Sequence, residues 1–267
     1  MQISWASGVR VGALSVDPEG RVGVALWTHR VWRRPPARLT LGSAPLAALW
    51  EGVQGLPFGV GAVAAGLRLE LLPTGYGPGG AAALLAEDGQ RALVVGPTTA
   101  TLTPRRVDDL VLAAPAPAAP PTDWLAQAEA AATAGSPLRL VAPDGAAAAA
   151  IAEALDAAGI PHARPGWLPG GRSGARVRVV GRGSGLAVDL RPGVDHAWRV
   201  QFARTCSAER VWVHGPTADA LARRLTEAGL PARVIQAPAQ LVLSGLAAHE
   251  SRALPPSHGP VARAPEE

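Results

Sequence analysis

The chain has 267 residues, and 48% of them are apolar, so it can bury a substantial core as one large domain or two small ones. All 25 basic residues are arginine, and the net charge of +4 permits an anionic partner without requiring one. The single cysteine excludes a disulfide framework, and no segment is typical of a signal peptide or a membrane span, so we expect a cytoplasmic protein without membrane contact.

The first 115 residues are expected to be rich in strands. Strands at 9–16 and 21–27 flank Asp17-Pro18-Glu19-Gly20, whose proline and glycine favour a turn, and the two strands are predicted to form a hairpin. Ser43 is the expected N-cap of a helix that continues to about residue 52. Glu87-Asp88-Gly89 predicts a second hairpin between its flanking strands. The remaining strands expected in this half are 38–41, 67–72, 81–86, 90–95 and 110–112.

The second half alternates helices and strands. The helices are expected at 123–134, 145–158, 196–205 and 217–228. The strands are expected at 138–142, 177–180, 186–190, 211–213 and 232–235. Strands combined with helices in this way predict a layered α/β fold. The polar, proline-rich stretch from about residue 254 is expected to be loose.

Three histidines lie at junctions between predicted elements. His29 follows a strand, His196 begins a helix, and His214 lies between a strand and a helix. Side chains at the carboxyl ends of strands line the usual cleft of layered α/β folds. These histidines are therefore either metal ligands or ordinary capping and loop residues.

The order of segments resembles the metallo-β-lactamase fold. Within that fold it is similar to the β-CASP nucleases, especially the DNA-ligase-associated exonucleases and related RNA-processing nucleases. The resemblance covers about residues 8–234 and rests on "SVDPEGRVGVALWTHRVWRRP", "LELLPTGYGPGGAAALLAEDGQRALVVGP", "DDLVLAAP" and "VDHAWRVQFARTCSAERVWVHGPTADALARRLTEAGLPARV". It implies an αββα sandwich. Residues 1–115 form its first half, 116–185 a shortened β-CASP-like insertion, 186–240 the return to the core, and 241–267 a tail.

The resemblance also implies a metal site, and most of its ligands are missing here. Active members are implied to bind two zinc ions and to hydrolyse phosphodiesters. The matching positions that survive are His29, His196 and His214, together with the non-ligand Asp195. The others are occupied by Val31, Arg33, Arg34, Tyr76, Pro97, Ala113 and Trp198. Because arginine stays charged and repels cations, we expect no cofactor, with a single residual zinc on the three histidines as the alternative.

The expected function follows from this loss. We expect a catalytically degenerate relative of these nucleases that acts as a non-catalytic nucleic-acid-binding or scaffold subunit in DNA or RNA processing. Its expected partners are nucleic acid and an active nuclease, ligase or helicase. The alternatives are an active metal-dependent exonuclease with an atypical site, an enzyme that uses Asp195 and His196 without metal, and a pure protein-interaction module.

Arginines near the former metal loop suggest where an anion could bind. Arg33, Arg34 and Arg38 could bind phosphate, and Trp32 and Trp198 could stack on bases. The alternative is a solvated loop with packed tryptophans. A second basic stretch contains Arg172, Arg176, Arg178 and Arg182, and it is open to the same two interpretations.

Overall fold

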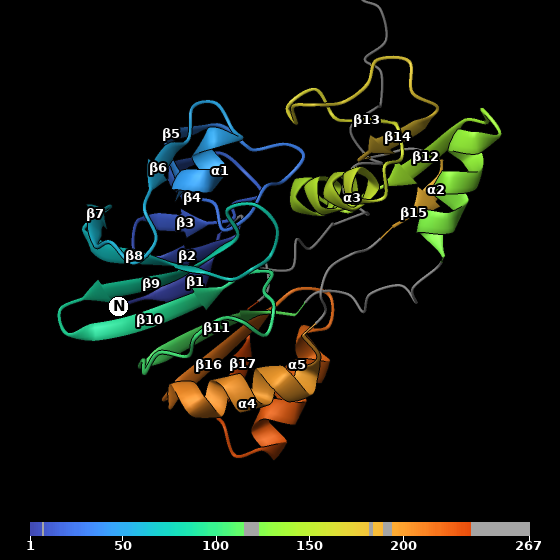
Figure 1. The fold of residues 1–267 in the computed structure, drawn as a ribbon. Helices are drawn as coiled ribbons and strands as arrows, with labels where there is room; N and C mark the ends of the chain where they lie inside the picture. The colour runs from blue at the N-terminus through green and yellow to red at the C-terminus, as the bar shows by residue number, and fades with distance from the viewer. Residues whose placement is uncertain (7, 115–122, 182–183, 189–193, 236–267) are drawn as a thin grey trace, which may run out of the picture. The chain divides into compact units, whose positions relative to one another are not determined.

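A computed structural model describes residues 1–6, 8–114, 123–181, 184–188 and 194–235 (Figure 1). The helices found in these ranges are α1 (Ala44–Ala48), α2 (Trp124–Thr133), α3 (Gly145–Ala157), α4 (His196–Cys206) and α5 (Ala218–Glu227). None of these helices is long and apolar enough to cross a membrane. The predicted looseness of the stretch from residue 254 falls outside the described residues.

The first sheet is mixed and has six strands in the described part of the chain. Its strands, in spatial order, are β1 (Ile3–Trp5), β2 (Val9–Val11), β3 (Leu14–Val16), β4 (Val22–Leu26), β5 (Ala37–Ser43) and β6 (Gln54–Leu56). The pairs β1–β2 and β2–β3 are antiparallel, whereas β3 to β6 run parallel.

The second sheet has seven strands among the described residues. In spatial order they are β17 (Ala232–Val234), β16 (Arg210–His214), β11 (Asp109–Ala113), β10 (Gln90–Val95), β9 (Ala81–Glu87), β8 (Leu67–Pro73) and β7 (Ala62–Ala64). The central strands are apolar at successive positions because both of their faces are buried. In β9, Ala83 and Leu85 face the first sheet, whereas Ala82 and Leu84 belong to the cluster under α4 and α5.

The two large sheets and three helices form four layers (Figure 1). Side chains from β2–β5 and from β8–β11 share one core cluster, so the sheets pack face to face. Helices α4 and α5 cover the outer face of the seven-stranded sheet. Helix α1 covers the outer face of the first sheet through Leu46, which packs with Ala25 and Trp27.

A third, smaller sheet is built from the middle of the chain. Its strands are parallel and follow the order β13 (His162–Ala163), β14 (Val177–Val180), β12 (Leu138–Val141) and β15 (Leu186–Ala187). Leu140, Val177 and Val179 pack with Ala148 and Ile151 of α3. Arg139 and Arg178 alternate with these apolar residues, lie opposite each other in the register, and are exposed.

Local sequence signals explain several boundaries. Ser43 caps α1 by accepting a hydrogen bond from Leu46 N at 3.2 Å, although the helix ends at Ala48 and is shorter than predicted. Asp144 caps α3 in the same way through Ala147 N, at 2.8 Å. The second predicted hairpin is confirmed, since β9 and β10 are antiparallel and Asp88 and Gly89 both have positive φ, as a tight two-residue turn needs.

The first predicted hairpin is wrong. The stretch 9–16 forms two antiparallel strands that reverse at Gly12 and Ala13, and β4 runs parallel to β3. Asp17 N donates to Leu26 O at 2.9 Å, so β3 ends beside the carboxyl end of β4. The chain must therefore run back to the other end of β4 before that strand begins. The predicted α/β class is confirmed, whereas the domain boundaries and the metallo-β-lactamase-like sandwich stay predictions.

Candidate functional site

His29 lies in a hydrogen-bonded group at the end of β4. The Asp17 carboxylate accepts hydrogen bonds from Thr28 N, at 2.8 Å, and from the Thr28 hydroxyl. His29 Nδ1 lies 3.1 Å from Thr28 Oγ1 and 3.7 Å from Asp17 Oδ2. Its ring meets the Tyr76 ring edge-on, with centroids 6.1 Å apart. His29 is therefore part of a network that holds the end of the strand.

His214 and His196 lie on neighbouring segments and have different partners. His214 ends β16, and its ring centroid is 5.6 Å from that of Trp5. Burial lowers the pKa of His214, and the nearby Asp17 partly opposes this shift. His196 Nε2 lies 3.3 Å from Thr217 Oγ1. Burial, and then Arg199, lower the pKa of His196.

The residues present do not fit a two-zinc site. Within the described ranges, no group of three or more His, Cys, Asp or Glu side chains is placed to hold a metal ion. Tyr76, where the resemblance to the β-CASP nucleases implied a histidine ligand, donates its hydroxyl to Asp144 at 2.7 Å. Val31, Pro97 and Ala113 offer no side-chain donor atom to a metal.

Asp195 has a structural role. It is the N-cap of α4, and its Oδ1 accepts a hydrogen bond from Trp198 N at 2.7 Å. The buried Arg199, which the sequence did not single out, donates to Ala113 O at 3.1 Å and to Val194 O. Through these contacts, Asp195 and Arg199 anchor the start of α4.

Both predicted stacking residues, Trp32 and Trp198, are partly buried and pack against other side chains. Trp198 stacks on Phe202 with centroids 4.7 Å apart, and it lies against the core under α4. Trp32 donates its Nε1 to Ala142 O at 3.2 Å. Gly181 lies against the Trp32 ring so closely that a Cβ there would collide with it. These contacts favour packing over base stacking for both rings.

Two of the three candidate arginines share a pocket. Arg34 and Arg38 line a cavity of about 300 Å³, together with Gly52 and Gln54. Gly52 has a φ of +71°, and a Cβ there would lie 2.9 Å from Arg34 Nη2, so glycine fits this position on both counts. Arg33 is exposed and is not among the residues that line the cavity.

Arg30, which the sequence did not single out, belongs to a group that we call the Trp50 cluster: Trp27, Arg30, Arg34, Trp50 and Trp167. Arg30 is only 6% exposed, and its Cζ lies 4.3 Å from the Trp50 ring centroid and 4.5 Å from that of Trp167. Arg34 Cζ is 5.4 Å from the Trp50 centroid, and the Trp27 and Trp50 centroids are also 5.4 Å apart. Cation–π contacts of this kind stabilise a buried guanidinium.

The Trp50 cluster contains unpaired donors. Among the described residues, the buried side-chain nitrogen or oxygen atoms without a partner are Trp27 Nε1, Arg30 Nε, Arg30 Nη1 and Arg34 Nη1. Each such atom costs about 1–3 kcal/mol of desolvation. Burial lowers the pKa of Arg30 to about 10, with a smaller contribution from the charge of Arg34. The sequence signal that could have identified this cluster is an arginine shortly after a strand, flanked by the tryptophans Trp27 and Trp32.

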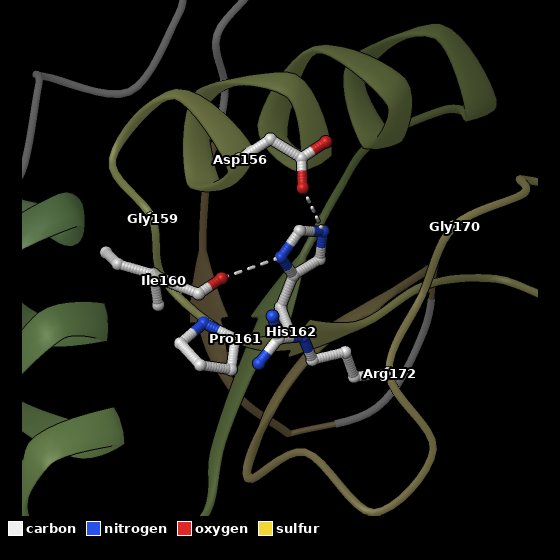
Figure 2. A pocket seen from close by; sticks show the side chains of 7 residues that line it. All are labelled: Asp156, Gly159, Ile160, Pro161, His162, Gly170 and Arg172. Carbon is white, nitrogen blue, oxygen red and sulfur yellow. Dashed lines mark hydrogen bonds and ion pairs between the residues drawn. The ribbon is translucent and has the colours of Figure 1, made fainter.

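A second pocket, of about 140 Å³, surrounds His162 (Figure 2). The His162 Nδ1 atom donates to Ile160 O at 2.9 Å, while Nε2 accepts from Arg164 Nε at 3.0 Å. Arg164 also pairs with Asp156. Both ring nitrogens thus have partners near the turn after α3, so the arrangement holds that turn.

A third pocket is lined by arginines of the four-stranded sheet. Arg139, Arg176 and Arg178 border a cavity of about 340 Å³. Arg172 is exposed and lines the His162 pocket instead. Arg182, the last member of the predicted basic stretch, lies outside the described residues. The predicted stretch is therefore divided between two pockets.

Comparisons with known proteins do not identify the family. No family model matches the sequence, and no curated protein does. Among solved structures, the chain is similar to the crystal structure of a protein of unknown function from Enterococcus faecalis V583. The identity is 10%, the match covers 80% of this chain and 79% of that chain, and the TM-score is 0.40. A likeness this weak supports no conclusion about function, so the class that the fold defines is a layered α/β protein.

Proposed function

We propose that the protein is a catalytically degenerate relative of the β-CASP nucleases that binds nucleic acid through its phosphates without cleaving it. The four-layer order of α1, two sheets, and α4 with α5 supports a metallo-β-lactamase-like sandwich. The four-stranded sheet with α2 and α3 then corresponds to the shortened insertion. A cytoplasmic location and an active nuclease, ligase or helicase partner belong to the same proposal.

One observation supports this function above the others. Arg34, which by the resemblance occupies the position of a metal ligand, lines the same cavity as Arg38, four residues later. Guanidinium groups match phosphate oxygens in charge and geometry. The histidines that could have supported hydrolysis are hydrogen-bonded to Thr28 and Thr217.

Fluorescence anisotropy with a labelled single-stranded oligonucleotide tests the proposal. The Arg34→Ala/Arg38→Ala variant should bind about tenfold or more weakly than wild type. The slope of log affinity against log salt should also fall in magnitude by about 0.7 for each phosphate that the variant no longer neutralises. A matched control is Arg68→Ala/Arg233→Ala, which removes two exposed arginines elsewhere. An equal decrease in the control, or no binding by wild type, contradicts the proposal.

A protein-interaction module is the second candidate, and an exposed sheet edge favours it. Val63 of the edge strand β7 is 75% exposed, and Val60 just before it is 51% exposed. Unpaired edge strands form templates for pairing with another chain. Sedimentation analysis over a range of concentrations should show self-association that Val63→Lys abolishes. A wild type that stays monomeric argues against this use of the edge.

A further inference from the structure

The donors of the Trp50 cluster have no acceptor in the described part of the protein. All four unpartnered atoms belong to Trp27, Arg30 and Arg34, and each of these residues packs against the Trp50 ring. Indole and guanidinium groups donate hydrogen bonds and do not accept them, so these side chains cannot satisfy one another. Buried polar groups in native proteins are nearly always paired. The missing partner is therefore an acceptor.

The charge of the cluster selects the kind of acceptor. Arg30 and Arg34 place two cations next to each other, and the Arg34 charge contributes to the lowered pKa of Arg30. A water molecule could accept hydrogen bonds from up to two N–H groups but would leave both charges unbalanced. An anion with several oxygens accepts from both guanidiniums and balances their charge. Arginine binds phosphate in this manner, often through two parallel hydrogen bonds.

We infer that the Trp50 cluster is a closed phosphate subsite, in which Arg30 and Arg34 bind one phosphate group after the Trp167 ring moves off Arg30. This inference deepens the proposed function and rests on it, because Arg34 also lines the cavity that it shares with Arg38. That cavity is the route by which a phosphate reaches Arg34. The phosphate comes from a nucleic-acid end or from a small phosphorylated molecule.

Trp167 is the cover that can move. Trp27 directly follows β4 and is 2% exposed, and Trp50 follows the short helix α1. All three rings lie outside helices and strands, but Trp167 lies in the connection 164–176 between β13 and β14, which is longer than the connections 27–36 and 49–53 that carry Trp27 and Trp50. The four unpartnered atoms are shielded from solvent, so an anion can reach Arg30 only when a covering ring leaves. Loss of the Trp167 ring should therefore open the subsite.

Titration with inorganic phosphate, followed by calorimetry, tests this arrangement. Trp167→Ala should bind phosphate about fivefold or more tightly than wild type, since the closed state no longer competes. The double variant Trp167→Ala/Arg30→Met should lose that gain, while Trp167→Ala/Arg30→Lys should keep part of it. Trp124→Ala removes another partly buried tryptophan of the same part of the chain and should leave phosphate binding unchanged. Equal affinities of wild type and Trp167→Ala, or a gain that survives Arg30→Met, overturn the inference.

Two further binding experiments identify the source of the phosphate group and test this inference separately from the proposed function. Trp167→Ala should discriminate between 5′-phosphorylated and unphosphorylated oligonucleotides if a nucleic-acid end is the source. A gain for inorganic phosphate alone indicates a small molecule, and either result supports the subsite. Arg38→Ala should weaken binding of the unphosphorylated oligonucleotide but not the Arg30-dependent binding of phosphate. If wild type binds no oligonucleotide but the Arg30-dependent binding of phosphate is seen, only the proposed function is contradicted. If wild type binds the oligonucleotide but the Arg30-dependent binding of phosphate is absent, only the subsite is contradicted.

Discussion

The loop after β4 joins two regions with opposite hydrogen-bonding patterns. At the start of the loop, Thr28 and His29 lie in a hydrogen-bonded network with Asp17. Next to His29, Tyr76 donates a hydrogen bond to Asp144. A few residues later, Arg30 and Arg34 carry buried donors without partners. Paired groups stabilise the fold, whereas unpaired charges destabilise it unless a ligand completes them. The contrast indicates a structural role for the histidine and leaves the arginines as the site of the proposed phosphate binding.

Removing the Asp17 carboxylate should disrupt the hydrogen-bonded network around Thr28 and cause the largest loss of unfolding free energy. Asp17→Ala leaves Thr28 N and its hydroxyl without their acceptor, and Thr28 is 0% exposed. The free energy of unfolding should fall by about 2–4 kcal/mol in urea titrations. Glu19→Ala removes a nearby exposed carboxylate and should change stability by less than about 0.5 kcal/mol. Similar losses in the two variants would show that Asp17 has no special role.

Tyr76→Phe should produce a smaller loss. It removes the hydroxyl that donates to Asp144 at 2.7 Å while keeping the ring beside His29. The expected decrease in unfolding free energy is about 1–2 kcal/mol. In a double-mutant cycle with Asp144→Ala, the two changes should not add, because they remove one shared hydrogen bond. Additive losses would disprove the coupling.

Arg30→Met tests whether the unpartnered guanidinium of Arg30 lowers the stability of the fold. Because it replaces an unpartnered charge with an apolar chain, stability should stay within about 1 kcal/mol of wild type or rise. Inorganic phosphate should raise the melting temperature of Trp167→Ala, and this shift should disappear when Arg30→Met is added. A loss above about 3 kcal/mol in Arg30→Met would mean that the guanidinium has a stabilising partner.

The smallest expected effect is a pH dependence near the histidines. The pKa of His214 lies below its ordinary 6.5 because of burial, so between that lowered pKa and 6.5 the unfolded chain binds more protons than the folded one. Stability should therefore be full above about pH 6.5 and decrease as the pH falls through that window. Urea titrations at several pH values should show this trend, and His214→Gln should flatten it. An opposite trend would contradict the direction of the shift.

Local chemistry made much of the fold predictable. The turn at Asp88 and Gly89 and the cap Ser43 depend on neighbouring residues, so short sequence windows predicted both. Asp144 and Asp195 cap their helices through equally local contacts, although we did not predict either of them as a cap from the sequence. The parallel pairing of β3 with β4 could not be predicted in that way. The parallel pairing requires residues 17–21 to run back along the length of β4, and the residue types of this turn do not specify that path.

The candidate site was predictable only in part. Arg34 and Arg38 are four positions apart and line one cavity, as their closeness in sequence suggested. Arg30 was missed because arginine after a strand is usually solvated, and its burial depends on Trp50 and Trp167 from distant segments. Trp32 and Trp198 looked available for stacking because their partners, such as Ala142 and Phe202, become neighbours only in the fold or on the helix.

The backbone contact between Arg30 and α3 has a consequence for measuring the subsite. Ala146 N donates to Arg30 O at 3.2 Å, and Gly145 leaves room for the Arg30 stem. The exchange of the Ala146 amide with deuterium is therefore limited by the position of Arg30. If phosphate binding displaces the Arg30 segment, this amide should exchange faster than its neighbours later in α3, so a single backbone position reports occupancy without any label.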